Sequence, residues 1–481
     1  MLKRIADLEF ACGVNRIVIH ESAHQPIDSM APGLSLDIYG MWFNRLSTWA
    51  EQARGWTDYM ARSSYMLQQG NNVADIAYFY GDEANATALF DKQKPAIPSS
   101  CNMDFINSDI LCHHLDADGG LLVTPGGSRF RMLVLGGTSD RLSLASLQAV
   151  KRLADQGATI VGRRPARAMG LKADSAEFDR IADDIWSGKR SNIVDTGSTR
   201  HAIDSLLDVP DFRCTHMDSI RYVHRTTGDA EIYWVNNRSK SDMHDWFEFR
   251  TTGRKPQIWN AVTGEISDVT YMTGSRSIYV EMDLKSADAL FVVFSGEADK
   301  RLRHRARESL PLRSDTIACP WRVVFGRKMG TPDAIVMDSL KSYIDTTLAI
   351  ANPAEARAVK YFSGTAAYHN RFFLGAVDSA RTYRINLGTV NNMAEVWVNG
   401  KYCGLTWFSP HSIDISEAVK SGENTLEIRV TNPWKNRICG DKLAKAGETT
   451  YTWTSYPWSK KTKNILMPAG LLGPVTITLY K

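Results

Sequence analysis

One strand–helix–strand stretch constrains the fold of this chain more than any other part of the sequence. Residues 131–135 form a short apolar run, residues 144–154 carry apolar side chains at helical spacing, and residues 158–162 are apolar and extended again. Ser143 is placed to cap the helix at its N-terminus, and Gly157 is placed to end it. This order and spacing predict a βαβ unit with its two strands parallel in one sheet.

The βαβ unit predicts a doubly wound, flavodoxin-like domain over residues 73–205. Residues 74–80 add another apolar strand to it. The turn at Gly136-Gly137 lacks the G-x-G-x-x-G pattern of a dinucleotide site, and no acidic residue follows where a ribose would need one. We therefore interpret this glycine pair as a turn and expect no nucleotide cofactor.

The pattern changes to short strands with period-two alternation from about residue 211 onwards. Residues 231–235 and 277–282 are examples, and they predict an antiparallel β-sandwich over residues 206–300. A basic, polar connector begins at about residue 301 and leads into a second set of alternating strands. Residues 301–481 are therefore predicted to hold the connector and a second β-sandwich.

The first 72 residues predict a different architecture. Residues 5–12 place apolar side chains on one helical face, residues 16–20 read as a short buried strand, and residues 43–69 read as a helix. A strand that ends in polar residues is typical of a parallel (β/α)8 barrel, whose strand ends carry the chemistry. The predicted fold class is therefore multidomain α/β plus all-β, with a C-terminal barrel remnant over residues 1–72.

Length and composition exclude several classes of protein. At about 150 residues per domain, 481 residues suggest several domains. The 57 basic and 53 acidic residues leave a net charge of +4 without a basic block, so nucleic acid is not an expected partner. No apolar run approaches the ~20 residues of a membrane helix, and Asp7 and Glu9 interrupt the apolar core that a signal peptide would need.

The densest polar group follows the predicted strand: His20, Glu21, His24 and Gln25. Imidazole and amide groups both donate and accept hydrogen bonds, which suits a sugar-binding or acid–base cluster. The alternative is a hydrogen-bonded turn that closes the strand. The H-E-x-x-H spelling does not predict zinc, because that motif needs a helix to bring both histidines to one face.

Other candidate groups have simpler interpretations. Asp116 and Asp118 resemble the start of a calcium loop, but no glutamate follows at position twelve, so we expect a turn. The seven cysteines form no C-x-x-C pair, and Cys101 with Cys112-His113-His114 has no familiar metal-ligand spacing. Four tryptophans are candidates for stacking on sugars, although most tryptophans are core and Trp397 alternates like a core residue; the four are Trp42, Trp49, Trp397 and Trp407.

Several segments taken together resemble the α-L-rhamnosidases of glycoside hydrolase family 106. Each segment is short, but their order along the chain is specific, and the resemblance extends over nearly the whole sequence. The region from residue 396 to residue 441 also resembles the galactose-binding-like jelly roll of family 2 glycosidases. The segments are G-V-N-R at 13–16, H-E-S-A-H-Q-P at 20–26, P-G at 32–33, W-F-N-R at 42–45, T-W at 48–49, M-L-Q-Q-G at 66–70, V-A-D-I at 73–76, Y-F-S-G-T-A at 361–366, V-W-V-N-G at 396–400 and N-R-I-C-G-D at 436–441.

The resemblance implies a sugar-binding pocket and the location of the catalytic groups. The residues expected to bind substrate are His20, Glu21, His24, Gln25, Trp42, Asn44 and Arg45. The paired catalytic carboxylates of such a barrel are expected upstream of Met1, which leaves Glu21, with Asp28 nearby, as a weak catalytic candidate. No metal is expected from the motifs, although calcium is compatible with the family.

Two hypotheses follow. The first is a C-terminal part of an α-L-rhamnosidase-like glycoside hydrolase that acts on rhamnose-containing oligosaccharides or polysaccharides and lacks the catalytic carboxylates. The alternative is a non-catalytic carbohydrate-binding or scaffold protein. No membrane partner is expected, and full-length relatives are expected in the bacterial periplasm or outside the cell.

Overall fold

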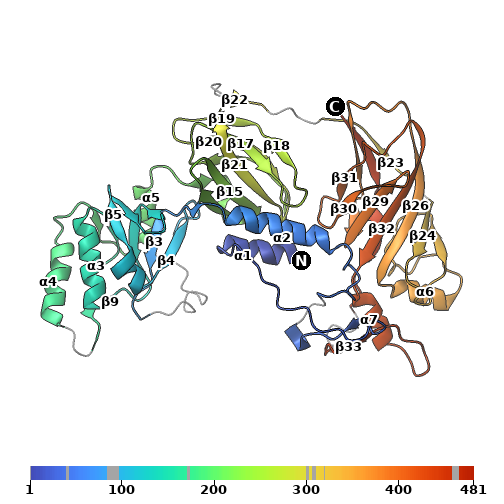
Figure 1. The fold of residues 1–481 in the computed structure, drawn as a ribbon, viewed down its shortest axis with the longest axis horizontal. Coiled ribbons are helices and arrows are strands. Elements are labelled where there is room, and N and C mark those ends of the chain that lie inside the picture. Colours follow the sequence, from blue (N-terminus) through green and yellow to red (C-terminus); the bar gives the residue numbers. More distant parts are fainter. Residues whose placement is uncertain are drawn as a thin grey trace. The chain divides into compact units, whose positions relative to one another are not determined.

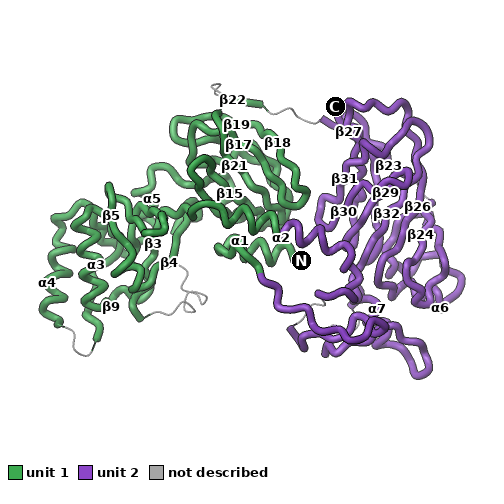
Figure 2. The backbone as a smooth tube through the Cα atoms, in the orientation of Figure 1, with its two compact units in different colours: residues 1–17, 61–307 green, residues 18–60, 308–481 purple. Residues whose placement is uncertain are grey.

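The structure is a computed structural model that describes residues 2–39, 43–83, 97–170, 174–298, 303–305, 310–318, 320–457 and 465–481. The chain divides into two compact units (Figure 2): unit 1 contains residues 1–17 and 61–307, and unit 2 contains residues 18–60 and 308–481. Both units are rich in strands (Figure 1), so the chain has the mixed α/β and all-β character that the sequence predicts. The helices are α1 (Leu2–Ala11), α2 (Ala53–Leu67), α3 (Leu144–Asp155), α4 (Ser175–Ile185), α5 (Thr199–Leu206), α6 (Pro353–Lys360) and α7 (Lys435–Lys442).

Unit 1 contains a five-stranded parallel sheet with the strand order β12-β10-β8-β3-β4. Its strands are β3 (Ile76–Phe79), β4 (Met103–Ile106), β8 (Met132–Leu135), β10 (Ile160–Val161) and β12 (Ile193–Val194). Numbered along the chain, they lie in the order 2-1-3-4-5 of flavodoxin-like sheets. Smaller sheets beside them are made of β5 (Asp116–Asp118), β6 (Leu121–Val123) and β7 (Arg129–Phe130), and of β9 (Arg141–Leu142) and β11 (Arg167–Ala168).

The predicted βαβ unit is confirmed. Strands β8 and β10 pair in parallel, and α3 connects them. The Ser143 hydroxyl caps α3 by accepting a hydrogen bond from the backbone N–H of Ser146 at 3.1 Å. Gly157, at φ +92°, follows the C-cap in a conformation that only glycine adopts easily. The short local motifs therefore determined this part of the fold.

Unit 1 also contains a β-sandwich. One sheet has the order β13-β16-β20-β19-β22 and the other the order β18-β17-β21-β15-β14-β2. Aromatic side chains fill the space between them, and Phe212 stacks on Tyr222 at 4.7 Å between ring centroids. The strands are β2 (Asn71–Asn72), β13 (Phe212–Arg213), β14 (Ile220–Thr226), β15 (Ala230–Asn237), β16 (Met243–Phe249), β17 (Arg254–Trp259), β18 (Ile266–Asp268), β19 (Tyr271–Thr273), β20 (Ile278–Leu284), β21 (Ala289–Glu297) and β22 (Arg303–His304).

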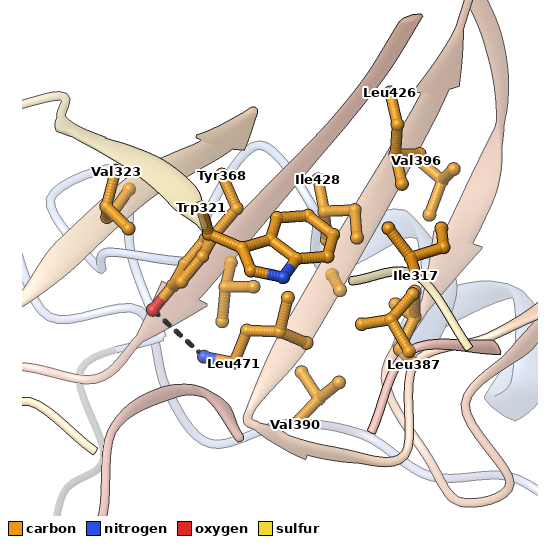
Figure 3. Close-up of a cluster of buried hydrophobic side chains, with 14 of the residues drawn as sticks. Ile317, Trp321, Val323, Tyr368, Leu387, Val390, Val396, Leu426, Ile428 and Leu471 are labelled. Atoms are coloured by element: carbon orange, nitrogen blue, oxygen red, sulfur yellow. Dashed lines mark hydrogen bonds between the residues drawn. The ribbon is translucent and has the colours of Figure 1, made fainter. Parts of the chain in front are cut away.

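Unit 2 is a second β-sandwich with sheets β23-β35-β27-β31 and β25-β24-β26-β32-β29-β30. Figure 3 shows its core, in which Trp321 lies among aliphatic side chains and the Tyr368 hydroxyl accepts a hydrogen bond from the backbone N–H of Leu471 at 3.0 Å. The strands are β1 (Pro32–Gly33), β23 (Pro311–Thr316), β24 (Trp321–Phe325), β25 (Ala334–Met337), β26 (Gly364–Leu374), β27 (Thr382–Asn386), β28 (Thr389–Asn391), β29 (Met393–Val398), β30 (Lys401–Thr406), β31 (Ser412–Asp414), β32 (Gly422–Asn432), β33 (Trp453–Thr454), β34 (Gly470–Gly473) and β35 (Thr476–Tyr480).

The predicted barrel strand over residues 16–20 is wrong. This segment is not a strand, and Val18 is 84% exposed although its apolar character suggested burial. A strand depends on a neighbour that accepts and donates its backbone hydrogen bonds. The strands that the structure describes before residue 73 are β1, which pairs with β33, and β2, which pairs with β14. The described residues therefore do not confirm a barrel remnant.

The helix predicted over residues 43–69 is shorter than expected. Residues 44–52 form successive turns, and α2 begins only at Ala53. In the first turn, the Asn44 side-chain oxygen accepts a hydrogen bond from the backbone N–H of Leu46 at 2.8 Å. Short polar side chains that bond to nearby backbone in this way compete with helix formation. The predicted helix was therefore correct only in its C-terminal part.

A buried charged network joins the parallel sheet to the β-sandwich within unit 1. His224 lies between two carboxylates, with Asp211 2.9 Å from Nδ1 and Glu231 2.9 Å from Nε2. Arg250 bridges Asp211 at 3.1 Å and Asp75 at 2.8 Å. Asp75 immediately precedes β3, whereas Arg250 follows β16. The network therefore ties the start of the parallel sheet to the β-sandwich.

The charge state of His224 follows from this network. Burial opposes the imidazolium, but Asp211 and Glu231 outweigh that effect and raise the pKa of His224 above its ordinary value of 6.5. Because the raised pKa belongs to the folded state, the stabilisation is fully present below about pH 6.5 and is lost as the pH rises through the folded-state pKa. Unit 1 should therefore lose stability from this group as the solution becomes alkaline.

We expect the free energy of unfolding of the wild type to exceed that of His224→Gln most at about pH 6, and the difference to shrink as the pH rises towards 9. Urea titrations at several pH values measure this difference. His244→Gln is the matched control, because His244 is 62% exposed and lies 3.0 Å from Asp283, a surface arrangement that contributes little. A His224→Gln difference that is constant across this pH range would contradict the assignment of a buried imidazolium.

Candidate functional site

The segment that carries most of the predicted site residues belongs to unit 2 and is held against the region of α7. Strand β1 pairs in parallel with β33. The indole N–H of Trp434, which immediately precedes α7, donates to the backbone oxygen of Leu46 at 2.8 Å. The backbone N–H of Ser35 donates to the Ser455 hydroxyl at 2.9 Å. Contacts from distant parts of the chain therefore position this segment.

Gln25 organises the loop around it. It is 5% exposed, its side-chain N–H donates to the backbone oxygen of Leu34 at 2.7 Å, and its side-chain oxygen accepts from the Leu34 N–H at 2.9 Å. Arg45 donates to the backbone oxygen of Gln25 at 2.7 Å and pairs with Asp28 at 2.6 Å. The structure therefore brings Gln25, Asp28 and Arg45 together, and the Gln25 amide is occupied by backbone.

Of the remaining predicted residues, three are exposed, one is partly buried and one is not described. His20, Glu21 and His24 are exposed, and Trp42 lies outside the described residues. Asn44 uses its side-chain oxygen on Leu46, whereas its side-chain nitrogen is buried without a hydrogen-bond partner among the described residues. The Thr48 hydroxyl oxygen is also buried without a hydrogen-bond partner among the described residues. Buried polar atoms of this kind are the exception in folded proteins and are candidates for a bound water or ligand.

The candidate tryptophans have different environments. Trp407 packs against Trp56 at 5.6 Å and Tyr59 at 5.7 Å between ring centroids, so it is a packing residue. The ring of Trp49 lies 5.8 Å from that of Phe43.

Trp397 differs from the expectation of a core residue. Its neighbours Val396 and Val398 are buried, whereas Trp397 is only half-buried. Because side chains alternate along a strand, Trp397 points away from the core. The Arg429 guanidinium lies 4.1 Å from its ring centroid.

The other groups considered from the sequence have structural partners. Arg152 pairs with Asp116 at 2.5 Å, and Arg129 lies 3.7 Å from Asp118. Burial raises the pKa of the Cys101 thiol to about 12, which keeps it protonated and a poor metal ligand. Within the part of the chain that the structure describes, no group of three or more His, Cys, Asp or Glu side chains could hold a metal ion.

The side chain of Tyr78 occupies the space beside the glycine turn that follows β8. The Tyr78 hydroxyl accepts a hydrogen bond from the backbone N–H of Gly137 at 3.1 Å. A Cβ atom added to Gly136 would lie 2.0 Å from that hydroxyl oxygen. The glycine therefore makes room for the tyrosine, which agrees with its interpretation as a turn.

The motif N-R-I-C-G-D at 436–441, which is part of the family resemblance, forms a buried cluster on α7. Arg437 pairs with Asp441 at 2.7 Å, and both side chains are buried. The guanidinium lies 5.2 Å from the ring centroid of Tyr451 and 5.9 Å from that of Tyr361. The i, i+4 spacing of Arg437 and Asp441 on a helix was the signal that could have identified the pair.

Comparison with known families identifies the class of protein. Residues 1–273 match the family model of α-L-rhamnosidases of glycoside hydrolase family 106, and residues 342–465 match the galactose-binding domain-like model of family 2 glycosyl hydrolases. The first match covers more than half of the 481 residues. The chain belongs to the α-L-rhamnosidase family 106 of glycoside hydrolases.

Individual relatives agree with this assignment. The structure of a rhamnosidase from Novosphingobium sp. PP1Y superposes with a TM-score of 0.91 at 37% identity, over 99% of this chain and 46% of that chain. A Formosa agariphila protein, provisionally named a beta-glucuronidase, is 23% identical and is matched over 99% of this chain and 61% of its own length. The chain therefore spans less than two thirds of the length of either relative.

A beta-D-glucuronidase from Dictyoglomus thermophilum is 21% identical with a TM-score of 0.25, over 36% of this chain and 29% of that chain. A likeness this distant assigns neither a fold nor an activity to this chain.

In the described residues, no helix is both long and apolar enough to cross a membrane.

Proposed function

We propose that this chain is a non-catalytic C-terminal part of an α-L-rhamnosidase-like glycoside hydrolase and that it binds rhamnose-containing glycans. Membership of the rhamnosidase family supports the substrate class. Of the two carboxylates considered from the sequence, Asp28 is paired with Arg45 at 2.6 Å and Glu21 is exposed, and the proposed absence of catalysis is based on these two environments. Hydrolysis with inversion needs two carboxyl groups, an acid and a base, about 6.5–9.5 Å apart.

The proposed binding residues lie on the segment that α7 and β33 support. Asn44 and Thr48 have buried polar atoms without partners among the described residues, and Arg45 is accessible beside them. Amide, hydroxyl and guanidinium groups match the donors and acceptors of sugar hydroxyls. His20, Glu21, His24, Gln25 and Trp42 remain proposed members of the same binding segment. Membership of the rhamnosidase family is the observation that carries the binding proposal.

The alternative proposal is a stand-alone carbohydrate-binding or scaffold protein in which the jelly roll binds the glycan. The half-buried Trp397 ring on the outer side of β29 favours this alternative. The two proposals differ in the residues on which binding depends. Loss of binding in Asn44→Ala supports the first, and loss of binding in Trp397→Ala supports the second.

We expect the purified chain to bind a rhamnose-containing oligosaccharide but not to hydrolyse an aryl α-L-rhamnoside. Without a second positioned carboxyl group, either the leaving oxygen is not protonated or the attacking water is not activated. Release of the aryl alcohol, followed by absorbance over many hours, tests hydrolysis. Isothermal titration of the same preparation with the oligosaccharide tests binding.

The matched control is Glu21→Gln, which keeps the size of the side chain and removes its charge. Both proteins should show only the background rate of hydrolysis. Turnover that persists in the purified wild type and disappears in Glu21→Gln would overturn the non-catalytic proposal. Absence of binding in the wild type would overturn the glycan-binding part.

A further inference from the structure

A cavity of about 510 Å³ lies in unit 2 beside α6, and no residue of the segment 18–60 lines it. Its volume falls in the range of about 300–1,000 Å³ that is typical of small-ligand sites. The family assignment and the proposed rhamnose site leave this cavity unexplained. The lining residues that matter are Tyr343, Leu348, Ile350, Arg357, Lys360 and Tyr361.

The sequence around α6 builds the cavity. Asn352 caps the helix by accepting a hydrogen bond from the backbone N–H of Ala354 at 2.9 Å, and Pro353 occupies the first turn. Val359 is fully buried in the core. Arg357 and Lys360, three residues apart, share one face of the helix and line the cavity.

One wall of the cavity is apolar and aromatic. Leu348 and Ile350 pack against the core of the β-sandwich, and Tyr343 is 2% exposed. The hydroxyl of Tyr343 accepts a hydrogen bond from that of Tyr368 at 2.7 Å, so this ring is fixed in place. The Tyr361 ring adds a partly exposed aromatic group. Such a wall can pack against the apolar face of a pyranose ring.

The charged residues that line the cavity are Asp345, Arg357 and Lys360, and they differ in their partners. Arg357 pairs with Glu448 at 3.0 Å. Asp345 accepts hydrogen bonds from both the backbone N–H and the hydroxyl of Thr347, at 2.8 and 2.7 Å. Lys360 has no carboxylate partner among the described residues, and its ammonium lies 5.8 Å from the ring centroid of Tyr361. A half-enclosed ammonium beside an aromatic ring favours an anionic ligand.

We propose that this cavity binds a sugar that carries a carboxylate, a uronate residue of an acidic glycan, with the carboxylate on Lys360 and the pyranose ring against Tyr361. The ammonium supplies a charge-assisted hydrogen bond to the carboxylate, and Arg357 lies on the same helix face as a second donor. The site is separate from the proposed rhamnose-binding segment and does not depend on it.

The test compares two glycosides that differ only in the carboxylate. Titration of the full chain with methyl β-D-glucuronide, followed by ligand-observed NMR, should show binding at least about ten-fold tighter than titration with methyl β-D-glucoside. Lys360→Gln should weaken glucuronide binding about ten-fold or more and leave glucoside binding unchanged, because it removes the charged partner alone. Lys360→Arg should retain most of the affinity.

Lys401→Gln is the matched control, because Lys401 is exposed, pairs with Glu417 at 2.8 Å, and does not line the cavity. It should bind the glucuronide like the wild type. The proposal is overturned if the wild type binds both glycosides equally, if it binds neither, or if Lys360→Gln binds the glucuronide as the wild type does. Titration of the same variants with a rhamnoside separates this result from a failure of the proposed rhamnose site.

Discussion

Replacing Trp321 by alanine is expected to lower the free energy of unfolding of unit 2 by about 3–5 kcal/mol. Trp321 is 0% exposed and lies in the core between the two sheets of the sandwich (Figure 3). Removing the indole loses the transfer free energy of a large apolar side chain and leaves a cavity, because close-packed neighbours relax only partly. Hydrogen exchange measured by mass spectrometry on peptides from β26 and β32 reports this loss within unit 2.

The control for this prediction is Phe373→Ala on β26. Phe373 is 77% exposed, so its removal should change the free energy of unfolding by less than about 0.5 kcal/mol. Peptides from the parallel sheet of unit 1 should exchange as in the wild type in both variants. Equal protection of these peptides from hydrogen exchange in Trp321→Ala and Phe373→Ala would show that Trp321 does not stabilise the core of unit 2.

The second large effect is expected for Arg250→Gln, which should destabilise unit 1 by about 3–5 kcal/mol. Arg250 is the cation shared by Asp75 and Asp211, whose side chains are 2% and 1% exposed. Burial already raises the pKa of Asp75 in the presence of Arg250. Removing the guanidinium leaves two buried carboxylates near each other with less compensation, which costs far more than the loss of a surface ion pair.

Chemical unfolding monitored by circular dichroism measures this change, and Arg180→Gln is its control. Arg180 is 70% exposed and lies 3.8 Å from Glu177 on α4, so its replacement should change the free energy of unfolding by at most about 1 kcal/mol. A similar stability of the two variants would mean that the network contributes no net stabilisation. The double replacement Arg250→Gln with Asp75→Asn should recover part of the loss.

Local patterns in the sequence predicted the regular parts of the fold. The βαβ unit could be predicted from the cap at Ser143, the helix end at Gly157 and the apolar runs on either side, because each of these features depends on contacts within a few residues. Period-two alternation likewise predicted strands in both sandwiches. The order of the strands in each sheet came only from the structure, since register depends on partners far along the chain.

The hydrogen bonds of the candidate site could not be predicted from local patterns in the sequence. Residue types placed His20, Glu21, His24 and Gln25 in one polar group, and the family resemblance added Arg45. The structure brings Gln25 and Arg45 together. The sequence did not indicate that the Gln25 amide is occupied by the Leu34 backbone, nor that the Asn44 nitrogen lacks a partner in the described residues. Hydrogen-bond satisfaction depends on the positions of all neighbouring groups.

By itself, the sequence determined the family of this protein, its mixed α/β and all-β character and the local start and end of its best-defined helix. Only the tertiary structure decided that residues 16–20 do not form a strand, that Trp397 points out of the sandwich and that Lys360 lines a cavity without a carboxylate partner among the described residues. The physical reason is the range of the interactions. Capping and periodicity act over one or two turns of chain, whereas strand pairing, burial and charge compensation depend on segments that meet only in the folded protein.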